Sequence, residues 1–114
     1  MTSALLVRSA RVLDIEEATY LEDHDVLAVD GRVAEVGRSL PADDTVEVLD
    51  AAGATLLPGL VDAHVHVTAG TADLSALPSW SPSYVTAHAG QIMRGMLERG
   101  FTTVRDVGGA DVGL

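Results

Sequence analysis

The sequence contains neither cysteine nor lysine, few aromatic residues and no long apolar run. Without cysteine, the chain can form neither a disulfide nor a thiolate zinc site. The longest early apolar run, residues 4–7, is too short for the core of a signal peptide or for a membrane span. We therefore expect a cytoplasmic protein.

Basic residues are also scarce, and all seven of them are arginines. The net charge is −10. Residues 1–50 hold 12 acidic and 4 basic side chains, a balance of −8, and residues 51–114 hold 5 and 3, a balance of −2. Such acidity disfavours nucleic acid and membranes as partners. A hydrophobic content of 47% favours a folded chain over a disordered one.

Residues 1–57 have the pattern of several short strands separated by turns. Apolar residues alternate or cluster over 4–8, 11–15, 26–29, 33–36, 45–49 and 54–57, with a polar connection over 16–25. Asp30-Gly31 predicts a tight hairpin, because glycine tolerates the positive φ that such turns need. We expect this part of the chain to form an all-β layer.

After Pro58-Gly59 the pattern changes to strand, helix, strand. Residues 60–67 alternate in polarity and predict a strand, and a loop rich in Thr, Ser, Ala and Pro follows over 68–83. Ser81-Pro82 predicts a helix start, and apolar residues then recur every three or four positions until Gly100. A β-branched strand follows over 101–104. Such a unit implies two parallel strands with a right-handed crossover.

His64 and His66 are the candidate metal ligands. Residues two apart on a strand lie about 6–7 Å apart on one face, so their imidazoles can converge on one cation. Asp62 lies on the same face and could orient a ligand or take part in substrate binding. The opposite face is apolar, so we expect other parts of the chain to cover it. It consists of Val61, Ala63, Val65 and Val67. Buried histidines would need partners. The alternative is a chance His-x-His pair on a face that meets water.

Two motifs carry a family resemblance. Residues 58–66, PGLVDAHVH, resemble the first-strand signature of the metal-dependent amidohydrolase superfamily. Residues 100–109, GFTTVRDVGG, resemble the second-strand segment of the branch that holds imidazolonepropionase-like proteins and Xaa-Pro and Xaa-Arg dipeptidases. The resemblance implies an α/β fold. Residues 1–57 would be a partial composite β-sandwich segment, and residues 58–114 would be strand 1, helix 1 and strand 2 of a (β/α)8 (TIM-type) barrel. A complete barrel takes about 250 residues, so we expect an N-terminal portion only.

The resemblance also implies a reaction. In that reaction, metal-activated water hydrolyses a C–N bond in a small amide, dipeptide or cyclic amide. The implied cofactor is a divalent metal, zinc, with one or two ions in the complete protein. His64 and His66 would be metal ligands. The superfamily's other ligands are a bridging carbamylated lysine, two further histidines and an aspartate from later strands, and this chain has no lysine. We therefore expect the 114 residues to supply no catalytic residue and to be inactive alone.

Other candidate site residues carry competing interpretations. Asp106, at the end of the second strand, could position substrate. We favour instead an ion pair with Arg105 or a hydrogen bond to the following Gly-Gly turn. Trp80 and Tyr84 could line a substrate mouth, but such residues more often pack a loop onto a helix. Two histidines are not expected to be ligands: His24, in an acidic loop, and His88, on the helix.

A second hypothesis belongs to a different class. The chain could be a non-catalytic truncated domain or an interaction module that pairs through its open sheet edge. That hypothesis predicts a homo-oligomer or pairing with a second chain, whereas the catalytic one predicts a small-molecule substrate and activity restored by a complementing C-terminal chain. Zinc binding that depends on His64 and His66 would favour catalysis, and metal-independent self-association would favour the module.

Overall fold

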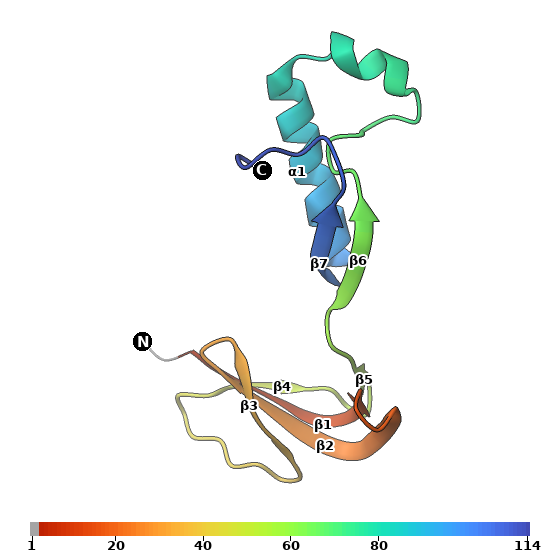
Figure 1. Cartoon of the computed structure of the whole chain (residues 1–114). Helices are drawn as coiled ribbons and strands as arrows, with labels where there is room; N and C mark the ends of the chain where they lie inside the picture. Colours follow the sequence, from red (N-terminus) through yellow and green to blue (C-terminus); the bar gives the residue numbers. More distant parts are fainter. Residues whose placement is uncertain (1–2) are drawn as a thin grey trace. The chain divides into compact units, whose positions relative to one another are not determined.

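The computed structural model describes residues 3–114, which form two compact units that divide between Pro58 and Gly59. The first unit contains strands only, and the second contains two strands and two helices (Figure 1). No helix in residues 3–114 is long and apolar enough to cross a membrane.

The first unit is a single five-stranded sheet. Its strands are β1 (Ala4–Asp14), β2 (Thr19–Val29), β3 (Arg32–Gly37), β4 (Glu47–Asp50) and β5 (Thr55–Leu56). The order is β3-β2-β1-β4, and β5 also pairs with β1. The pairs β1–β2 and β2–β3 are antiparallel, while β4 and β5 run parallel to β1. The prediction of a β-rich first part is confirmed.

The first two strands are longer than the apolar pattern predicts. The predicted strands over 4–8 and 11–15 form one strand, β1, which ends at Asp14 and whose register shifts around Ser9, a residue with φ of 55°. The prediction of a polar connection over residues 16–25 is wrong. The turn is confined to residues 15–18, and β2 begins at Thr19. A bulge carries the extra residue without ending the strand. Backbone pairing with β1 therefore makes a strand of residues whose polar side chains face water.

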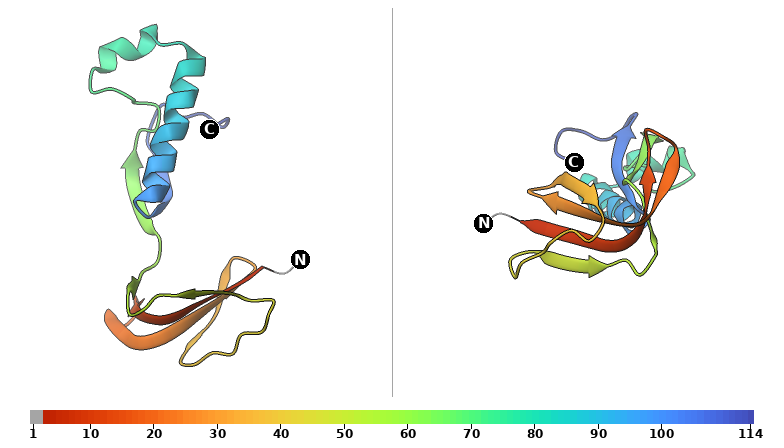
Figure 2. Two further views of the ribbon diagram at one scale, coloured as in Figure 1. Left: turned by 180° about the vertical axis from the view of Figure 1, so that it is seen from behind. Right: turned by 90° about the horizontal axis from the view of Figure 1, so that it is seen from below.

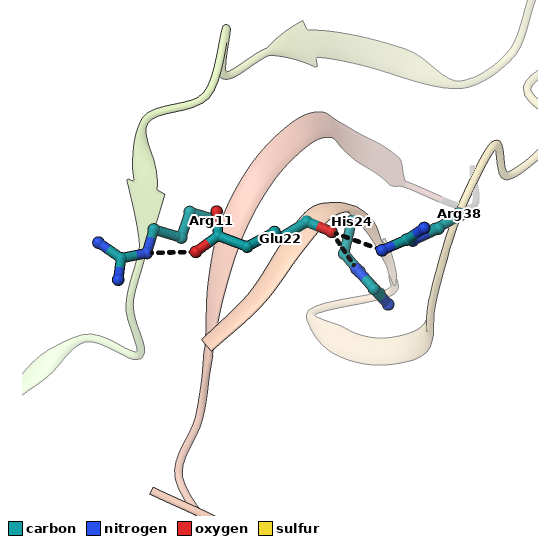
Figure 3. A network of polar contacts seen from close by, with 4 residues as sticks. All are labelled: Arg11, Glu22, His24 and Arg38. Atoms are coloured by element: carbon teal, nitrogen blue, oxygen red, sulfur yellow. Dashed lines mark hydrogen bonds and ion pairs between the residues drawn. The ribbon is translucent and has the colours of Figure 1, made fainter. Parts of the chain in front are cut away.

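Cross-strand contacts on that polar face stabilise the part of β2 that has no apolar pattern. The Arg11 Nε lies 2.8 Å from a Glu22 carboxylate oxygen, and the Arg11 guanidinium lies 3.9 Å from the centre of the Tyr20 ring. Figure 3 shows the same stretch of β2, where the Glu22 carbonyl oxygen accepts from Arg38 at 3.2 Å and lies 2.8 Å from His24 Nδ1. Such pairs stabilise neighbouring strands.

The hairpin at Asp30-Gly31 is confirmed. Both residues have positive φ, 50° and 75°, and Val29 faces Arg32 across the turn. Positive φ at both central positions is the geometry of the two-residue turns whose twist matches paired strands.

Asp25 is the one buried charged residue in the described part of the chain, with 6% of its surface exposed. Its two carboxylate oxygens accept from the Ser9 N–H at 3.0 Å and the Leu40 N–H at 2.9 Å. The Ser9 N–H, together with the Leu40 N–H and the Arg8 guanidinium, holds the pKa of Asp25 below its ordinary value, although burial raises it. The carboxylate thus fixes the β1 bulge to the segment that follows β3.

The Asp25→Asn variant should lower the free energy of unfolding by about 1–3 kcal/mol at pH 7, because an amide offers one acceptor and turns a donor toward the second N–H. Since folding lowers the pKa of Asp25 below 3.8, its ionisation stabilises the fold above that pH, and this contribution is lost as the pH falls through the folded-state pKa. Urea unfolding at pH 7 and near pH 3 measures both effects. Asp44→Asn, the same change at an exposed position, is the control. An equal loss in both variants, or a deficit unchanged at low pH, would contradict this role.

The second unit is a strand-helix-strand arrangement. It consists of β6 (Leu60–Val65), the 3₁₀ helix η1 (Leu74–Ser79), α1 (Pro82–Glu98) and β7 (Phe101–Asp106). As expected, β6 and β7 pair in parallel. The helix α1 lies alongside the strand pair in both side views (Figures 1 and 2). The core holds Val65, Val67 and Ala89, with Met93, Met96 and Ala110 packed against them.

The boundaries of α1 follow the predicted signals. Ser81 caps the helix, since its Oγ accepts from the Tyr84 N–H at 3.2 Å, and Pro82 is the first helical residue. The helix ends at Glu98, and Gly100 adopts φ of 89°. A proline costs nothing at the first position, where its missing N–H would have no helical partner, and glycine tolerates the left-handed conformation that follows the helix.

Two expectations for the second unit are wrong. Strand β6 ends at Val65, two residues early, because β7 ends at Asp106 and the Val67 N–H turns to the Asp106 carboxylate instead of a ladder partner. The loop over 68–83 contains η1, which Asp73 caps by accepting from the Ser75 N–H. The apolar face of β6 is covered only at its carboxyl end, so that Val61 remains 67% exposed.

Candidate metal site

His64 and His66 stand at the carboxyl end of β6. His64 belongs to the strand and His66 follows its last residue directly. Their ring centroids lie 5.4 Å apart, with an angle of 72° between the planes. Both histidines are exposed, so this face of β6 meets water in the described residues. Within this unit α1 covers the opposite face, where Val65 and Val67 are buried.

Asp106, the last residue of β7, accepts two main-chain hydrogen bonds at the same end of the strand pair. Its Oδ2 accepts from the Val67 N–H at 2.8 Å, and its Oδ1 accepts from the Gly108 N–H at 2.8 Å. These two bonds, that of Val67 first, hold the pKa of Asp106 below its ordinary value, and the nearby His66 adds to the effect. The hydrogen bond to the Gly-Gly turn is thus present, while no ion pair with Arg105 occurs in residues 3–114.

The ring of His66 has a main-chain partner, which the sequence did not predict. Its Nδ1 lies 2.9 Å from the carbonyl oxygen of Gly108. A carbonyl oxygen only accepts, so Nδ1 donates, and in the neutral ring the lone pair is then on Nε2. The ring of His64 has no such hydrogen bond within the described residues; only its main-chain N–H is held, by Asp62 Oδ1 at 3.0 Å.

The donor set fits one edge of a metal site. Imidazole nitrogen is a favoured ligand of zinc, and His66 presents a nitrogen with a free lone pair. However, residues 3–114 contain no group of three or more His, Cys, Asp or Glu side chains able to hold a metal ion. Zinc sites usually have three or four protein ligands. The carboxylates of Asp62 and Asp106 are engaged by backbone N–H groups, so a bound cation would need further ligands.

Trp80 belongs to an aromatic cluster on the loop and α1. Its ring centroid lies 5.0 Å from that of Tyr84, at 88°, and 6.1 Å from that of His88. Among residues 3–114, Tyr84 and His88 are the aromatic side chains whose rings pair with that of Trp80. The loop returns to the cluster at Gly70, where an added Cβ would lie 2.6 Å from His88 Nδ1. This Nδ1 is buried without a hydrogen-bond partner. The cluster therefore packs the loop onto the helix.

Two glycines have roles that the sequence did not predict, one at the candidate site and one in the loop packing. Gly108 supplies the carbonyl that orients His66, and Gly70 allows the loop to approach His88. A signal for Gly108 was available, since the carboxyl ends of adjacent parallel strands meet at one edge. His66 and the Gly-Gly turn both follow such ends. Gly70 lies in a loop without periodicity and offers no comparable signal.

Comparisons with known proteins identify the family of this chain. The amidohydrolase family profile matches residues 47–108, and the chain belongs to this family. A dihydroorotase of Pelobacter propionicus is 46% identical over 63 residues, which are 55% of this chain and 15% of the relative. A deacetylase of Brucella anthropi is 38% identical over 81 residues, which are 71% of this chain and 17% of the relative. The chain thus spans about one sixth of the length of these relatives.

Solved structures are similar over nearly the whole chain. An amidohydrolase crystal structure is 39% identical with a TM-score of 0.89, and a prolidase complexed with N-methylphosphonate-L-proline is 34% identical with a TM-score of 0.90. Each match covers 97% of this chain and 27% of the other. The predicted resemblance to the amidohydrolase superfamily is confirmed.

The loop packing at Gly70 can be tested with a matched pair of variants. Gly70→Ala should lower the free energy of unfolding by about 1–3 kcal/mol, because its Cβ would overlap the His88 ring and approach Trp80 to 3.1 Å. Gly90→Ala, at an exposed helical position with nothing within 4 Å, should raise it by up to about 1 kcal/mol. Chemical denaturation followed by Trp80 fluorescence measures both. Equal effects of the same sign would show that Gly70 has no packing role.

Proposed function

We propose that the chain supplies the first part of the active site of a metal-dependent hydrolase that acts on C–N bonds. The proposed substrates are small amides, dipeptides or cyclic amides. Family membership supports this class, and a dihydroorotase and a prolidase are among the similar proteins. The observation that carries the proposal is the His64–His66 pair at the carboxyl end of β6, with Nε2 of His66 left free.

His64 and His66 would hold a divalent cation, with zinc the first choice for imidazole donors. When bound, such a cation polarises a carbonyl group and lowers the pKa of water. The chain's own part is positional: β6 sets the spacing of the two rings, and Gly108 fixes the direction of one. Figure 1 shows η1 and its loop beyond the carboxyl ends of β6 and β7, the edge at which barrel enzymes bind substrate.

The proposed fold places this chain within a larger one. Residues 58–114 would be strand 1, helix 1 and strand 2 of a (β/α)8 barrel, and residues 1–57 would be part of a composite β-sandwich. The parallel β6–β7 pair with its crossover helix supports the first assignment, and the single open sheet of the first unit supports the second. The further metal ligands would come from outside these 114 residues, which we expect to be inactive alone.

Zinc binding tests the proposed function directly. His64→Ala and His66→Ala should each weaken zinc binding by about tenfold or more, because two donors leave little redundancy. Competition with a chromophoric chelator measures the affinity. His24→Ala is the matched control, since that ring lies against the Glu22 carbonyl in the first unit. Unchanged affinity in the two site variants, or an equal loss in the control, would overturn the proposed ligands.

A second candidate function is the interaction module. The first unit leaves apolar side chains on the surface of its sheet, among them Val33 at 66% and Leu49 at 56% exposure. Exposed apolar patches of this kind are typical of surfaces that another chain covers. Sedimentation with and without a chelator distinguishes the two candidates. Self-association that does not depend on zinc would favour the module.

A further inference from the structure

We propose that Asp106 is the positioning residue of the candidate metal site. Through the Gly108 carbonyl it holds His66 in the tautomer that is protonated at Nδ1 and offers Nε2 to a divalent cation. This inference rests on the proposed function, because it assigns a role toward the metal that His64 and His66 would hold. It concerns a side chain that itself contributes no ligand.

The first step is the placement of the Gly108 residue through its N–H. The Asp106 Oδ1 accepts from the Gly108 N–H, and Oδ2 accepts from the Val67 N–H, both at 2.8 Å. One carboxylate therefore joins the segment after β7 to the segment after β6. Each of these bonds has a charged acceptor, which makes it stronger than a bond between neutral groups.

The second step is the shape of the turn. Gly109 adopts φ of 108°, a conformation that other residues rarely adopt, and an added Cβ there would overlap Thr68 Oγ1. The turn thus lies directly against the chain that leaves β6. Val107 adds a further tie, because its N–H donates to the Val65 carbonyl at 3.1 Å. The Gly108 carbonyl therefore lies between two restrained points: the Gly108 N–H, which Asp106 accepts, and Gly109, which packs against Thr68.

The third step is the effect on the imidazole. The Gly108 carbonyl accepts from His66 Nδ1 at 2.9 Å, which selects the tautomer with the lone pair on Nε2. Metal-binding histidines commonly donate their other ring N–H in this way, and loss of that partner costs on the order of 10–100-fold in metal affinity. The His64 ring has no hydrogen bond among the residues described. The chain therefore presets one of its two candidate ligands.

Nitrogen-15 NMR of the imidazole rings tests this role at about pH 8.5, where an ordinary histidine is neutral. Wild-type His66 should show a protonated Nδ1. In Asp106→Asn, which keeps one acceptor of two, His66 should populate both tautomers, and zinc affinity should fall by about 10–100-fold. Asp106→Glu, which keeps both carboxylate oxygens, should recover part of the loss. Asp111→Asn, an equal charge change in a residue that accepts from Gly113, should leave both readouts at wild-type values.

Gly109→Ala provides a second route to the same result. It disturbs the turn through Thr68 while leaving the charge of Asp106 intact, so it should also mix the His66 tautomers. If Asp106→Asn does not fold, as judged by circular dichroism, Gly109→Ala decides the question.

The outcomes separate this inference from the proposed function. If wild-type protein and all variants fail to bind zinc, the proposed function fails, and the tautomer comparison still decides whether Asp106 orients His66. A His66 ring that keeps Nδ1 protonated in both Asp106→Asn and Gly109→Ala would overturn the inference, even if zinc affinity fell. A fall in affinity together with mixed tautomers, both reversed toward wild type in Asp106→Glu, would support it.

Discussion

The parallel pairing of β6 and β7, closed at its carboxyl end by the Asp106 carboxylate, is the interaction on which the second unit depends. A pair of parallel strands satisfies its backbone groups only along its length, and its ends must find other partners. Here a single side chain accepts the N–H of Val67 and that of Gly108, one from each departing segment. The same bonds keep the His66 ring and the Gly108 carbonyl within hydrogen-bonding distance. Closure of the strand pair and orientation of a candidate ligand are thus one arrangement.

Local signals in the sequence predicted the parts of the fold that local chemistry decides. Ser81 and Pro82 at the start of α1, Gly100 after its end, and Asp30-Gly31 in the hairpin each act within a few residues, and each stands where expected. The length of β2 was not predictable in this way. Its first residues are polar, and they form a strand because β1 lies beside them and because Arg11 meets Glu22 and Tyr20 across the pair. Pairing between distant residues overrides the apolar pattern that the prediction relied on.

At the candidate site, too, the sequence predicted what local pattern decides and missed what distant contacts decide. The alternation of residues 60–67 placed His64 and His66 together, and the structure has their rings in contact. Both rings are exposed, because α1 covers one face of β6 and leaves the other open. The partner of the His66 ring is a main-chain carbonyl 42 residues away in sequence. Every residue has a backbone carbonyl, so a sequence pattern does not indicate which carbonyl a side chain will meet. The contact follows from the register of β6 against β7.

The exposure of the two histidines decides which interactions can order their rings. In a buried site, surrounding side chains restrict an imidazole, whereas an exposed ring keeps its rotamers unless a directed bond holds it. His66 has such a bond and His64 does not, so the two candidate ligands enter metal binding with different freedom. Fixing one ring before the cation arrives lowers the entropy that binding must remove, and the free ring can then adjust to ligands supplied from elsewhere. For a chain proposed to supply one edge of a metal site, one preset donor beside one adaptable donor is a consistent division of roles.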